Sequence, residues 1–343
     1  MAMSFIVITV VIVLLLSYYF FCEDRFVVRR NAVINLPIDT IAQDLSDLNQ
    51  WPHWIPWLIY EPNAKVDFNY SNTGNNAVLP SYLEWQGELV KNGYISIIPA
   101  RSNVHYCHAI IEVEAFFPGE LHFNIDLSKQ GSHTLVSIQI TGDIPFLKRW
   151  QAACYLVRAT RDLELSIIRL TAHLARYNQS DHYQYDNPTF RALTQTKLKH
   201  FDAVTRPFTV RDQPMSQKME QGFHDLLTLL GPNNPPAGPS FAIYTKADPV
   251  HHYFSGKLGI STQNLEPCDS RPERITLDGN YLTILYGGNY QNLSLAWHIA
   301  HNLRRLHNLR FDRKRPGVEI FENGPCDTSD SKDYVTKICL PIK

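Results

Sequence analysis

The feature that most constrains this sequence is a segment that occurs twice, 77 positions apart, as Pro239 and Pro316 show. The earlier copy is Pro239-Ser240-Phe241-Ala242-Ile243-Tyr244, and the later copy runs from Pro316 to Phe321. The same offset relates Leu226 and Leu229, which have helix-like spacing, to Leu303 and Leu306. A helix followed by a strand is therefore predicted twice, as parts of a duplicated unit.

The two copies differ at one inner position of the predicted strand. Glu319 of the later copy corresponds to Ala242 of the earlier copy. A carboxylate that breaks the symmetry of a duplication marks a candidate site of chemistry. The alternative is a solvent-facing glutamate on a strand, and the pattern alone does not separate the two interpretations.

Length and composition indicate a globular protein. At 343 residues the chain is long enough for about two domains of roughly 100 to 200 residues each. Hydrophobic and charged fractions of 44% and 19% are those of folded proteins. The formal net charge of −1 argues against an extended nucleic-acid surface, which requires clustered Lys and Arg. One local basic run is interpreted as a solvated helix end: Arg304, Arg305, Arg310, Arg313, Lys314 and Arg315.

The cysteines and histidines predict neither a disulfide framework nor a metal site. His298 and His301 are one helical turn apart, but no H-E-x-x-H motif and no third ligand accompany them. No metal, no cofactor and no Ser/His/Asp constellation is therefore predicted. The six cysteines are scattered without a C-x-x-C pair: Cys22, Cys107, Cys154, Cys268, Cys326 and Cys339.

Residues 1–22 contain no charged side chain, and the stretch from Phe5 to Leu16 is almost purely aliphatic. About 20 apolar residues cross the hydrocarbon core of a bilayer, and the aromatic run 18–21 suits its interface. We predict a retained transmembrane anchor, because there is no basic n-region and no small-residue cleavage site. By the positive-inside rule, the arginines at 25, 29 and 30 place the body of this single-pass protein in the cytoplasm.

Residues 26–177 are predicted to form a first domain. A strand and a short helix precede alternating strands between residues 66 and 140. Trp51, Trp54 and Trp57 are too many tryptophans for a surface loop. Beyond them, the sheet must wrap around one long amphipathic helix to bury both apolar faces. From Phe146 to about Arg176 its apolar residues are Leu147, Trp150, Cys154, Val157, Leu165, Ile168, Ala172 and Ala175.

This first region resembles the SRPBCC (START-like, polyketide cyclase) superfamily. The resemblance implies a helix-grip fold with an apolar cavity between the sheet and the long helix. It does not define an activity, because the superfamily contains lipid carriers, sensors and cyclases. The matching residues are Val28-Arg29-Arg30, Ile34-Asn35-Leu36-Pro37, Trp51-x-x-Trp54-x-Pro56-Trp57, Glu61-Pro62-Asn63-Ala64 and Gly142-Asp143-Ile144-Pro145-Phe146-Leu147.

Residues 178–198 are polar and are predicted to be a linker. Residues 199–343 contain the duplication, in which each copy reads as strand, helix, strand and strand. Two such βαββ copies would pair their sheets about a pseudo-twofold axis and leave a concave groove between their helices. The predicted fold class is therefore α+β, behind an N-terminal transmembrane helix.

This second region resembles the gyrase-inhibitor-like (GyrI-like, SOUL-type) effector-binding domain. The resemblance implies that Glu319 lies in an aromatic-walled pocket and faces cationic or polarised ligands. The family commonly has Glu-x-Tyr on this strand and Thr-Glu near the C-terminus, where this chain has Phe321 and Lys337. Those departures remove a hydroxyl and a second acid. The matching residues are Gly238-Pro239-x-x-Ala242-x-Tyr244, Gly288-x-Tyr290-x-x-Leu293-x-x-Ala296-Trp297, Glu319-Ile320-Phe321-x-x-Gly324-Pro325 and Thr336-Lys337-Ile338-x-x-Pro341.

Aromatic residues are predicted to wall a ligand pocket around Glu319. Aromatic faces beside a carboxylate recognise cations, and each ring contributes roughly 0.5 to 2 kcal/mol. Burial would raise the pKa of Glu319 and suit it to general acid or base work. The alternative is that these aromatics are ordinary core. The predicted pocket residues are Trp297, Tyr286, Tyr290, Tyr244 and Phe321.

The leading functional hypothesis is a membrane-anchored protein whose two pocket domains bind or sense a hydrophobic or amphipathic cationic small molecule. One alternative is a hydrolase of electrophilic small-molecule toxins, with Glu319 as its catalytic residue. The other is a protein-interaction module whose groove binds a peptide or a topoisomerase surface. No nucleic-acid partner is predicted, and the sequence predicts neither the ligand nor the oligomeric state.

Overall fold

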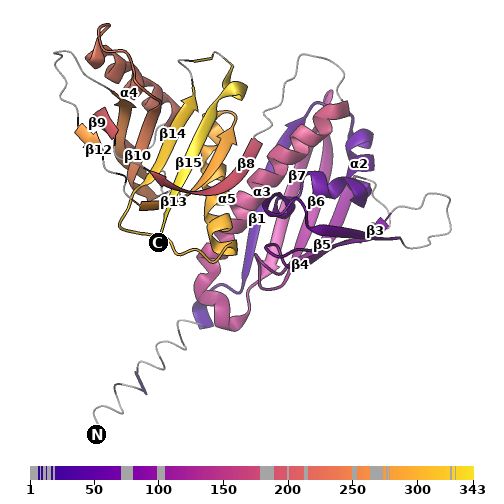
Figure 1. Ribbon diagram of the computed structural model, residues 1–343. Coiled ribbons are helices and arrows are strands. Elements are labelled where there is room, and N and C mark those ends of the chain that lie inside the picture. The colour runs from indigo at the N-terminus through magenta and orange to yellow at the C-terminus, as the bar shows by residue number, and fades with distance from the viewer. Residues whose placement is uncertain are drawn as a thin grey trace. The chain divides into compact units, whose positions relative to one another are not determined.

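The computed structural model places the chain in two compact units, Met1–Tyr185 and Asp186–Lys343. Each unit contains one antiparallel sheet with helices packed on it, which confirms the predicted α+β class (Figure 1). The structure describes residues 7, 9–10, 13, 17, 20–70, 80–98, 105–177, 189–198, 201–211, 215–248, 253–262, 273–275, 277, 279–324, 327–328 and 330–343.

The first unit is a seven-stranded sheet of order β1-β7-β6-β5-β4-β3-β2, with the long helix α3 against β1 and β7 (Figure 1). Strands β2 to β7 form a meander, and β1 pairs with its last strand along ten residues. The elements are β1 (Arg25–Ile34), α2 (Ile38–Ser46), η1 (Leu48–His53), η2 (Trp57–Tyr60), β2 (Lys65–Tyr70), β3 (Pro80–Gln86), β4 (Asn92–Ile98), β5 (Tyr106–Val113), β6 (Glu120–Gln130), β7 (His133–Asp143), η3 (Phe146–Gln151), α3 (Ala152–Leu174) and η4 (Ala175–Tyr177).

The core of this unit lies on the inner face of its sheet. Val28, Ile140, Phe123 and Ala109 are paired in register across four strands, and all four are buried. The alternation of buried and exposed residues along these strands is that of a sheet with one face in the core.

The three clustered tryptophans belong to this core, as predicted. Trp51, Trp54 and Trp57 are each 0% exposed. Trp51 donates its Nε1 hydrogen to the backbone oxygen of Leu45 at 2.9 Å, and Trp57 donates to Oδ2 of the buried Asp162 on α3 at 3.1 Å. The apolar bodies of these rings are buried, while two of the three indole N–H groups have partners.

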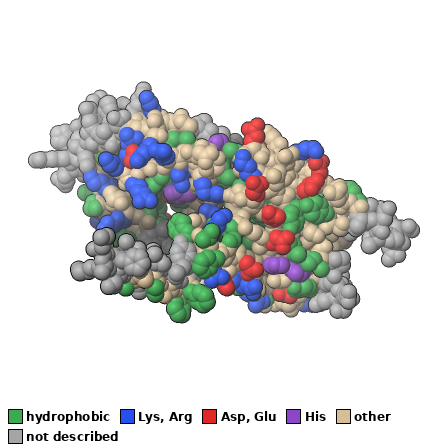
Figure 2. Space-filling model, turned by 90° about the horizontal axis from the view of Figure 1, so that it is seen from below, with side chains coloured by type: hydrophobic (Ala, Val, Ile, Leu, Met, Phe, Trp, Pro, Cys, Tyr) green, Lys and Arg blue, Asp and Glu red, His purple; other side chains and the backbone are tan. Residues whose placement is uncertain are grey.

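The predicted apolar stripe of the long helix is wrong in its first half. Leu147, Trp150, Cys154 and Val157 are exposed. Figure 2 is seen from below relative to Figure 1, and it shows hydrophobic side chains, in green, on that face of the structure. The face that α3 buries includes polar groups, since the Asp162 carboxylate accepts from Trp57 and Ser166 donates to the Asp162 backbone oxygen at 2.9 Å. Buried residues of α3 are Tyr155, Ala159, Asp162, Leu163, Leu165, Ser166, Leu170 and Leu174.

The second unit is an eight-stranded sheet of order β12-β9-β11-β10-β14-β15-β13-β8. Its elements are β8 (Thr189–Leu198), β9 (Phe201–Val210), α4 (Met215–Leu230), β10 (Ser240–Asp248), β11 (Tyr253–Ser261), β12 (Glu273–Ile275), β13 (Gly279–Gly287), η5 (Tyr290–Asn292), α5 (Leu293–Leu306), β14 (Gly317–Asn323), η6 (Ser331–Asp333) and β15 (Val335–Ile342).

The duplication is visible in this strand order. One copy contributes β9-β11-β10 and the other contributes β13-β15-β14, so that the equivalent strands β10 and β14 meet at the centre of the sheet. Ala242 pairs directly with Glu319, and these two residues are equivalent under the 77-residue offset. The approximate twofold axis of the duplication therefore passes between them.

The predicted linker is wrong over its second half. Residues 189–198 form β8, which pairs with β13 at the edge of the second sheet, and residues 178–188 lie outside the described part of the chain. An edge strand is bonded on one side only, so polar residues such as Thr189, Thr196 and Lys197 suit it. Such a composition resembles that of a loop.

The predicted anchor, residues 1–22, lies largely outside the described residues and stays a prediction. Within the described part of the chain, no helix is both long and apolar enough to cross a membrane.

Candidate functional site

Glu319 is a buried residue at the centre of the second sheet. Its side chain is 2% exposed, which excludes the solvent-facing alternative. Its neighbours across β10 and β15 are Ala242 and Ile338. The opposite face of the sheet carries an apolar cluster, which includes Val318 and Cys339. Glu319 therefore points to the face covered by the helices.

Two neutral groups donate hydrogen bonds to the Glu319 carboxylate. Trp297 on α5 donates its Nε1 hydrogen to Oε1 at 2.6 Å, and Tyr244 on β10 donates its hydroxyl hydrogen to Oε2 at 2.7 Å. Tyr244 comes from the first copy of the duplication and Trp297 from the second. Glu319 has no basic partner among the described residues, and such a carboxylate is costly to ionise.

The position of Trp297 depends on a glycine two residues before Glu319. A Cβ atom at Gly317 would lie 2.7 Å from Cη2 of Trp297, so the bare backbone lets the indole ring pack over the strand. The ring is half-buried, and its nitrogen reaches down to the carboxylate.

Replacing Gly317 by alanine should therefore displace the Trp297 ring and weaken its bond to Glu319. We expect the free energy of unfolding to fall by about 1.5 to 3 kcal/mol, the range for a hydrogen bond to a charged group. Equilibrium urea unfolding of the full chain in detergent micelles measures the loss. Gly119→Ala is the control, because no atom lies within 4 Å of a Cβ at that position. Equal effects of the two substitutions would contradict this account of the ring.

The carboxyl group of Glu319 titrates near neutral pH. Burial raises its pKa to about 7, against the opposing effect of the hydrogen bonds from Trp297 and Tyr244. Burial also raises the pKa of Tyr244 well above its usual value, and the adjacent Glu319 adds to this. Close to pH 7, the carboxyl group therefore has access to both its protonated and its ionised form.

Aromatic rings surround the hydroxyl group and the carboxylate. The Tyr244 ring meets Trp297 edge-on, with centroids 6.1 Å apart and planes at 82°. Phe254 on the adjacent strand β11 and Phe208 on β9, the strand beyond it, contact Tyr244 at 6.4 and 5.7 Å between centroids. Neither phenylalanine was predicted as a site residue. Only the pairing of β10 with β11 and of β11 with β9 shows that these two residues lie beside Tyr244.

The remaining predicted pocket residues lie on the same face of the sheet but have other partners. Phe321 packs against Phe223 of α4 at 5.5 Å and against Tyr290 at 5.3 Å between centroids. Tyr290 also stacks obliquely on Tyr334, with centroids 4.8 Å apart. These four rings form a second aromatic cluster.

Tyr286 has a structural position near the end of β13, just before the turn that leads to α5. Its side chain is fully buried, its ring packs against Phe190, and its hydroxyl donates to the backbone oxygen of Asn289 at 2.7 Å. The structure therefore brings Trp297 and Tyr244 directly to Glu319, and it engages the Tyr286 hydroxyl elsewhere.

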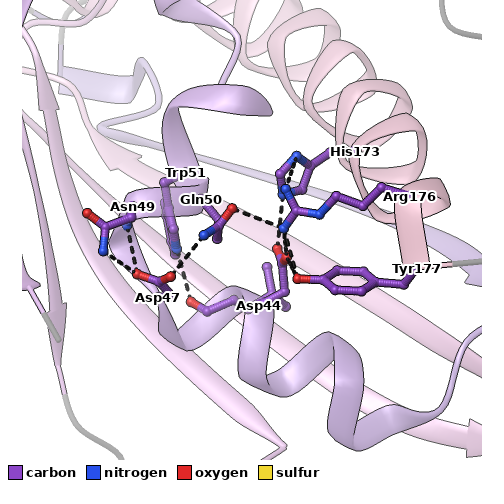
Figure 3. Close-up of polar contacts among 9 residues, drawn as sticks. Asp44, Asp47, Asn49, Gln50, Trp51, His173, Arg176 and Tyr177 are labelled. Atoms are coloured by element: carbon purple, nitrogen blue, oxygen red, sulfur yellow. Dashed lines mark hydrogen bonds and ion pairs between the residues drawn. The ribbon is translucent and has the colours of Figure 1, made fainter. Parts of the chain in front are cut away.

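The first unit contains another buried carboxylate, shown in Figure 3. The Asp44 side chain is 0% exposed, and its Oδ2 accepts from Arg176 at 2.6 Å and from Tyr177 at 3.0 Å. His173 Nε2 lies 3.4 Å from Asp44 Oδ1. Arg176 also donates to Gln50 at 3.0 Å. This network joins α2 and η1 to the C-terminal end of α3, and we interpret it as a structural tie.

The described residues contain no group of three or more His, Cys, Asp or Glu side chains that could hold a metal ion. His298 instead lies 3.0 Å from the side-chain nitrogen of Asn302, one turn further along α5.

No family model matches the chain. No curated protein sequence matches it either. Among solved structures, the C-terminal domain of EcmrR is similar, with 13% identity over 44% of this chain and 97% of that chain, and a TM-score of 0.36. SAV2435 bound to tetraphenylphosphonium has 15% identity over 45% and 94% of the two chains and a TM-score of 0.31. A START superfamily protein from Mycobacterium smegmatis has 15% identity over 44% and 98%, and a TM-score of 0.33. Similarities this low do not assign the chain to a family.

Proposed function

We propose that the second unit binds a small organic cation with hydrophobic groups at Glu319. The observation that carries the proposal is a buried carboxylate with two neutral donors and no basic partner among the described residues. It lies at the axis of a duplicated unit, where the other copy has Ala242. The GyrI-like resemblance implies the same role for this residue.

The energetics of the site favour a cationic ligand. Ionising Glu319 in the folded protein is unfavourable, because burial removes its hydration. A cation beside the carboxylate would compensate that loss, and its contact with the half-buried rings of Trp297 and Tyr244 would add roughly 0.5 to 2 kcal/mol per ring. Phe208 and Phe254 meet the Tyr244 ring edge-on, and these contacts hold it in place.

We extend the proposal to the whole chain as a membrane-anchored binding protein. Residues 1–22 would form the anchor, with the body in the cytoplasm. The first unit would hold a second hydrophobic ligand, as its START-like resemblance implies. Two buried indole nitrogens, Nε1 of Trp54 and of Trp85, have no acceptor among the described residues, which suits a ligand that carries a hydrogen-bond acceptor.

Binding of a matched pair of probes tests the role of Glu319. Tetraphenylphosphonium is a lipophilic cation, and triphenylphosphine oxide is a neutral molecule with similar rings. In the full chain in micelles, Glu319→Gln should weaken binding of the cation by about 1.5 to 3 kcal/mol and leave the neutral probe nearly unaffected. Affinity of the wild type for the cation should fall about tenfold per pH unit below pH 7, because protonation competes with binding.

The control is Glu322→Gln, since Glu322 is an exposed acid on the same strand that pairs with Lys337 at 2.5 Å. It should leave both affinities unchanged. Equal losses for both probes in Glu319→Gln would mean that the acid shapes the pocket and does not recognise charge. Absence of micromolar binding of either probe to the wild type would exclude the proposal.

A second candidate function is hydrolysis of an electrophilic small molecule. It is favoured by the pKa of about 7 at Glu319, which suits a general base, and by the Tyr244 hydroxyl 2.7 Å away. In this case Glu319 would deprotonate water while the aromatic rings hold the electrophile. Turnover of strained-ring electrophiles that persists in Glu319→Gln would exclude that mechanism.

A further inference from the structure

The first unit exposes an apolar stripe at the beginning of its long helix. Leu147 is 78% exposed, Trp150 58%, Phe146 44% and Val157 43%. Leu147, Trp150, Cys154 and Val157 follow one another at three- and four-residue spacing, so they share one side of η3 and the first turns of α3. Exposed apolar patches of this kind mark interaction surfaces. We call Phe146, Leu147, Trp150 and Val157 the η3 patch.

The η3 patch lies beside the point at which the N-terminal segment joins the folded unit. The backbone N–H of Ile144 donates to the backbone oxygen of Asp24 at 2.6 Å, and Arg149 forms an ion pair with the Asp24 carboxylate at 3.4 Å. Figure 1 shows the start of β1, in indigo, next to η3 and the beginning of α3, in magenta. Phe20 and Phe21, which directly precede this junction, are 78% and 87% exposed.

The chemistry of the η3 patch suits the interface of a lipid bilayer. Tryptophan is enriched where the headgroups meet the acyl chains, because its ring system is apolar and its indole N–H is polar. Phenylalanine and leucine are typical of the apolar face of helices that lie in this interface. Arg149 lies over the Phe146 ring, 5.4 Å from its centroid, and the nearby Arg25 pairs with Asp143 at 2.8 Å. The flanking arginines are therefore already paired, and Lys148 is an exposed basic residue within η3. Contact with lipid would depend mainly on hydrophobic burial, with this one lysine beside the headgroups.

We infer that the η3 patch rests in the headgroup region of the membrane and holds this end of the first unit against the bilayer. The inference rests on the anchor proposed above, because the uncharged segment 1–22 ends at the same junction. Phe20 and Phe21 of that segment and the side chains of the η3 patch would form one continuous apolar surface. The long helix α3 would then begin at the membrane and extend away from it.

Quenching of tryptophan fluorescence by brominated lipids tests the contact. The full chain is reconstituted into phosphatidylcholine vesicles with bromine atoms at defined depths of the acyl chain. Trp150 should be quenched most by the shallowest bromines, and Trp150→Phe should abolish that part of the quenching. The fluorescence of the core tryptophans 51, 54 and 57 is unaffected by the substitution, because they are 0% exposed.

Vesicle flotation after carbonate washing measures attachment by the anchor, whereas Trp150 quenching measures lipid contact by the η3 patch. Leu147→Asp should lower the equilibrium constant for lipid contact, which the Trp150 quenching reports, about tenfold or more, since loss of a buried leucine side chain costs about 1.5 to 3 kcal/mol and 1.4 kcal/mol is tenfold. Leu229→Asp is the control, because Leu229 is an exposed leucine of the second unit, 41% accessible. It should change neither flotation nor quenching.

Each outcome distinguishes the two proposals. Carbonate-resistant flotation without quenching that depends on Trp150 would keep the anchor and overturn the lipid contact. Flotation that carbonate reverses and Leu147→Asp abolishes would keep the contact and overturn the anchor. A protein that does not float overturns both. Efficient cross-linking between two Cys154 thiols, without lipid quenching, would show that a second copy of the chain covers the η3 patch instead.

Discussion

At pH 8, Glu319→Gln should raise the free energy of unfolding of the second unit by about 3 kcal/mol. Burial raises the pKa of Glu319 from its ordinary value of 4.5 to about 7, so the folded wild type at pH 8 contains an ionised carboxylate that the unfolded chain would hydrate. Glutamine resembles the protonated acid and removes that penalty. Its amide oxygen can accept from Trp297, while its amide nitrogen donates to the Tyr244 hydroxyl.

The pH dependence has a defined sign. Between pH 4.5 and about 7 the folded wild type binds more protons than the unfolded chain does, so its stability falls as the pH rises and levels off above pH 7. Glu319→Gln should lack this slope, and the two proteins should have similar stability near pH 5. Urea unfolding of the full chain in micelles between pH 5 and 8.5 measures both curves.

Glu322→Gln is again the matched control, since Glu322 is exposed and should not alter the slope. If the stabilities of wild type and Glu319→Gln change in parallel between pH 5 and 8, Glu319 is not the titrating group. A variant that is less stable at pH 8 would show that the bonds to Trp297 and Tyr244 outweigh desolvation. Either result would also count against Glu319 as a cation-binding residue, because that role requires a carboxylate that is costly to ionise without a ligand.

The symmetry of the second unit could be predicted because two copies of one sequence pattern fold into equivalent elements. Equal offsets in helix and strand place equivalent residues at equivalent positions, and an antiparallel pair of equivalent strands brings Ala242 and Glu319 together. What the sequence does not contain is the partner of each side chain. Trp297 reaches the carboxylate because Gly317 leaves space for its indole ring, and the Tyr286 hydroxyl instead donates to the backbone oxygen of Asn289 in the turn after β13.

The long helix illustrates a different limit. Periodicity identifies apolar residues that share a side of a helix, but it does not identify which side the fold buries. The buried side of α3 includes Asp162, because a tryptophan 105 positions earlier supplies a donor to its carboxylate. Long-range partners of this kind make a polar residue acceptable in the core, and a single sequence does not reveal them. The apolar residues left outside then form the η3 patch.

The structural tie around Asp44 in the first unit is the second site at which one substitution should have a large effect. Asp44→Ala should lower the free energy of unfolding of this unit by about 3 kcal/mol, the lower end of the range for breaking a buried ion pair. It removes the carboxylate that accepts from both Arg176 and the Tyr177 hydroxyl, and with it the charge beside His173. Arg176 is 39% exposed and can regain water, which keeps the loss at the lower end.

Asp39→Ala is the matched control on the same helix, because the Asp39 side chain is 90% exposed. Its ion-pair partner is the half-exposed His105, at 3.5 Å. The substitution should cost less than about 1 kcal/mol, as exposed pairs do.

Burial alone would raise the pKa of Asp44, but His173, Tyr177 and Arg176 lower it below its ordinary value of 3.8. The contribution of Asp44 is therefore fully present above pH 3.8 and declines as the pH falls below that value, so the stability difference between wild type and Asp44→Ala should be constant from neutral pH down to about pH 4 and shrink in stronger acid. Equal costs for the Asp44 and Asp39 substitutions at pH 7 would mean that α2 is held to the end of α3 by its apolar contacts and not by this carboxylate.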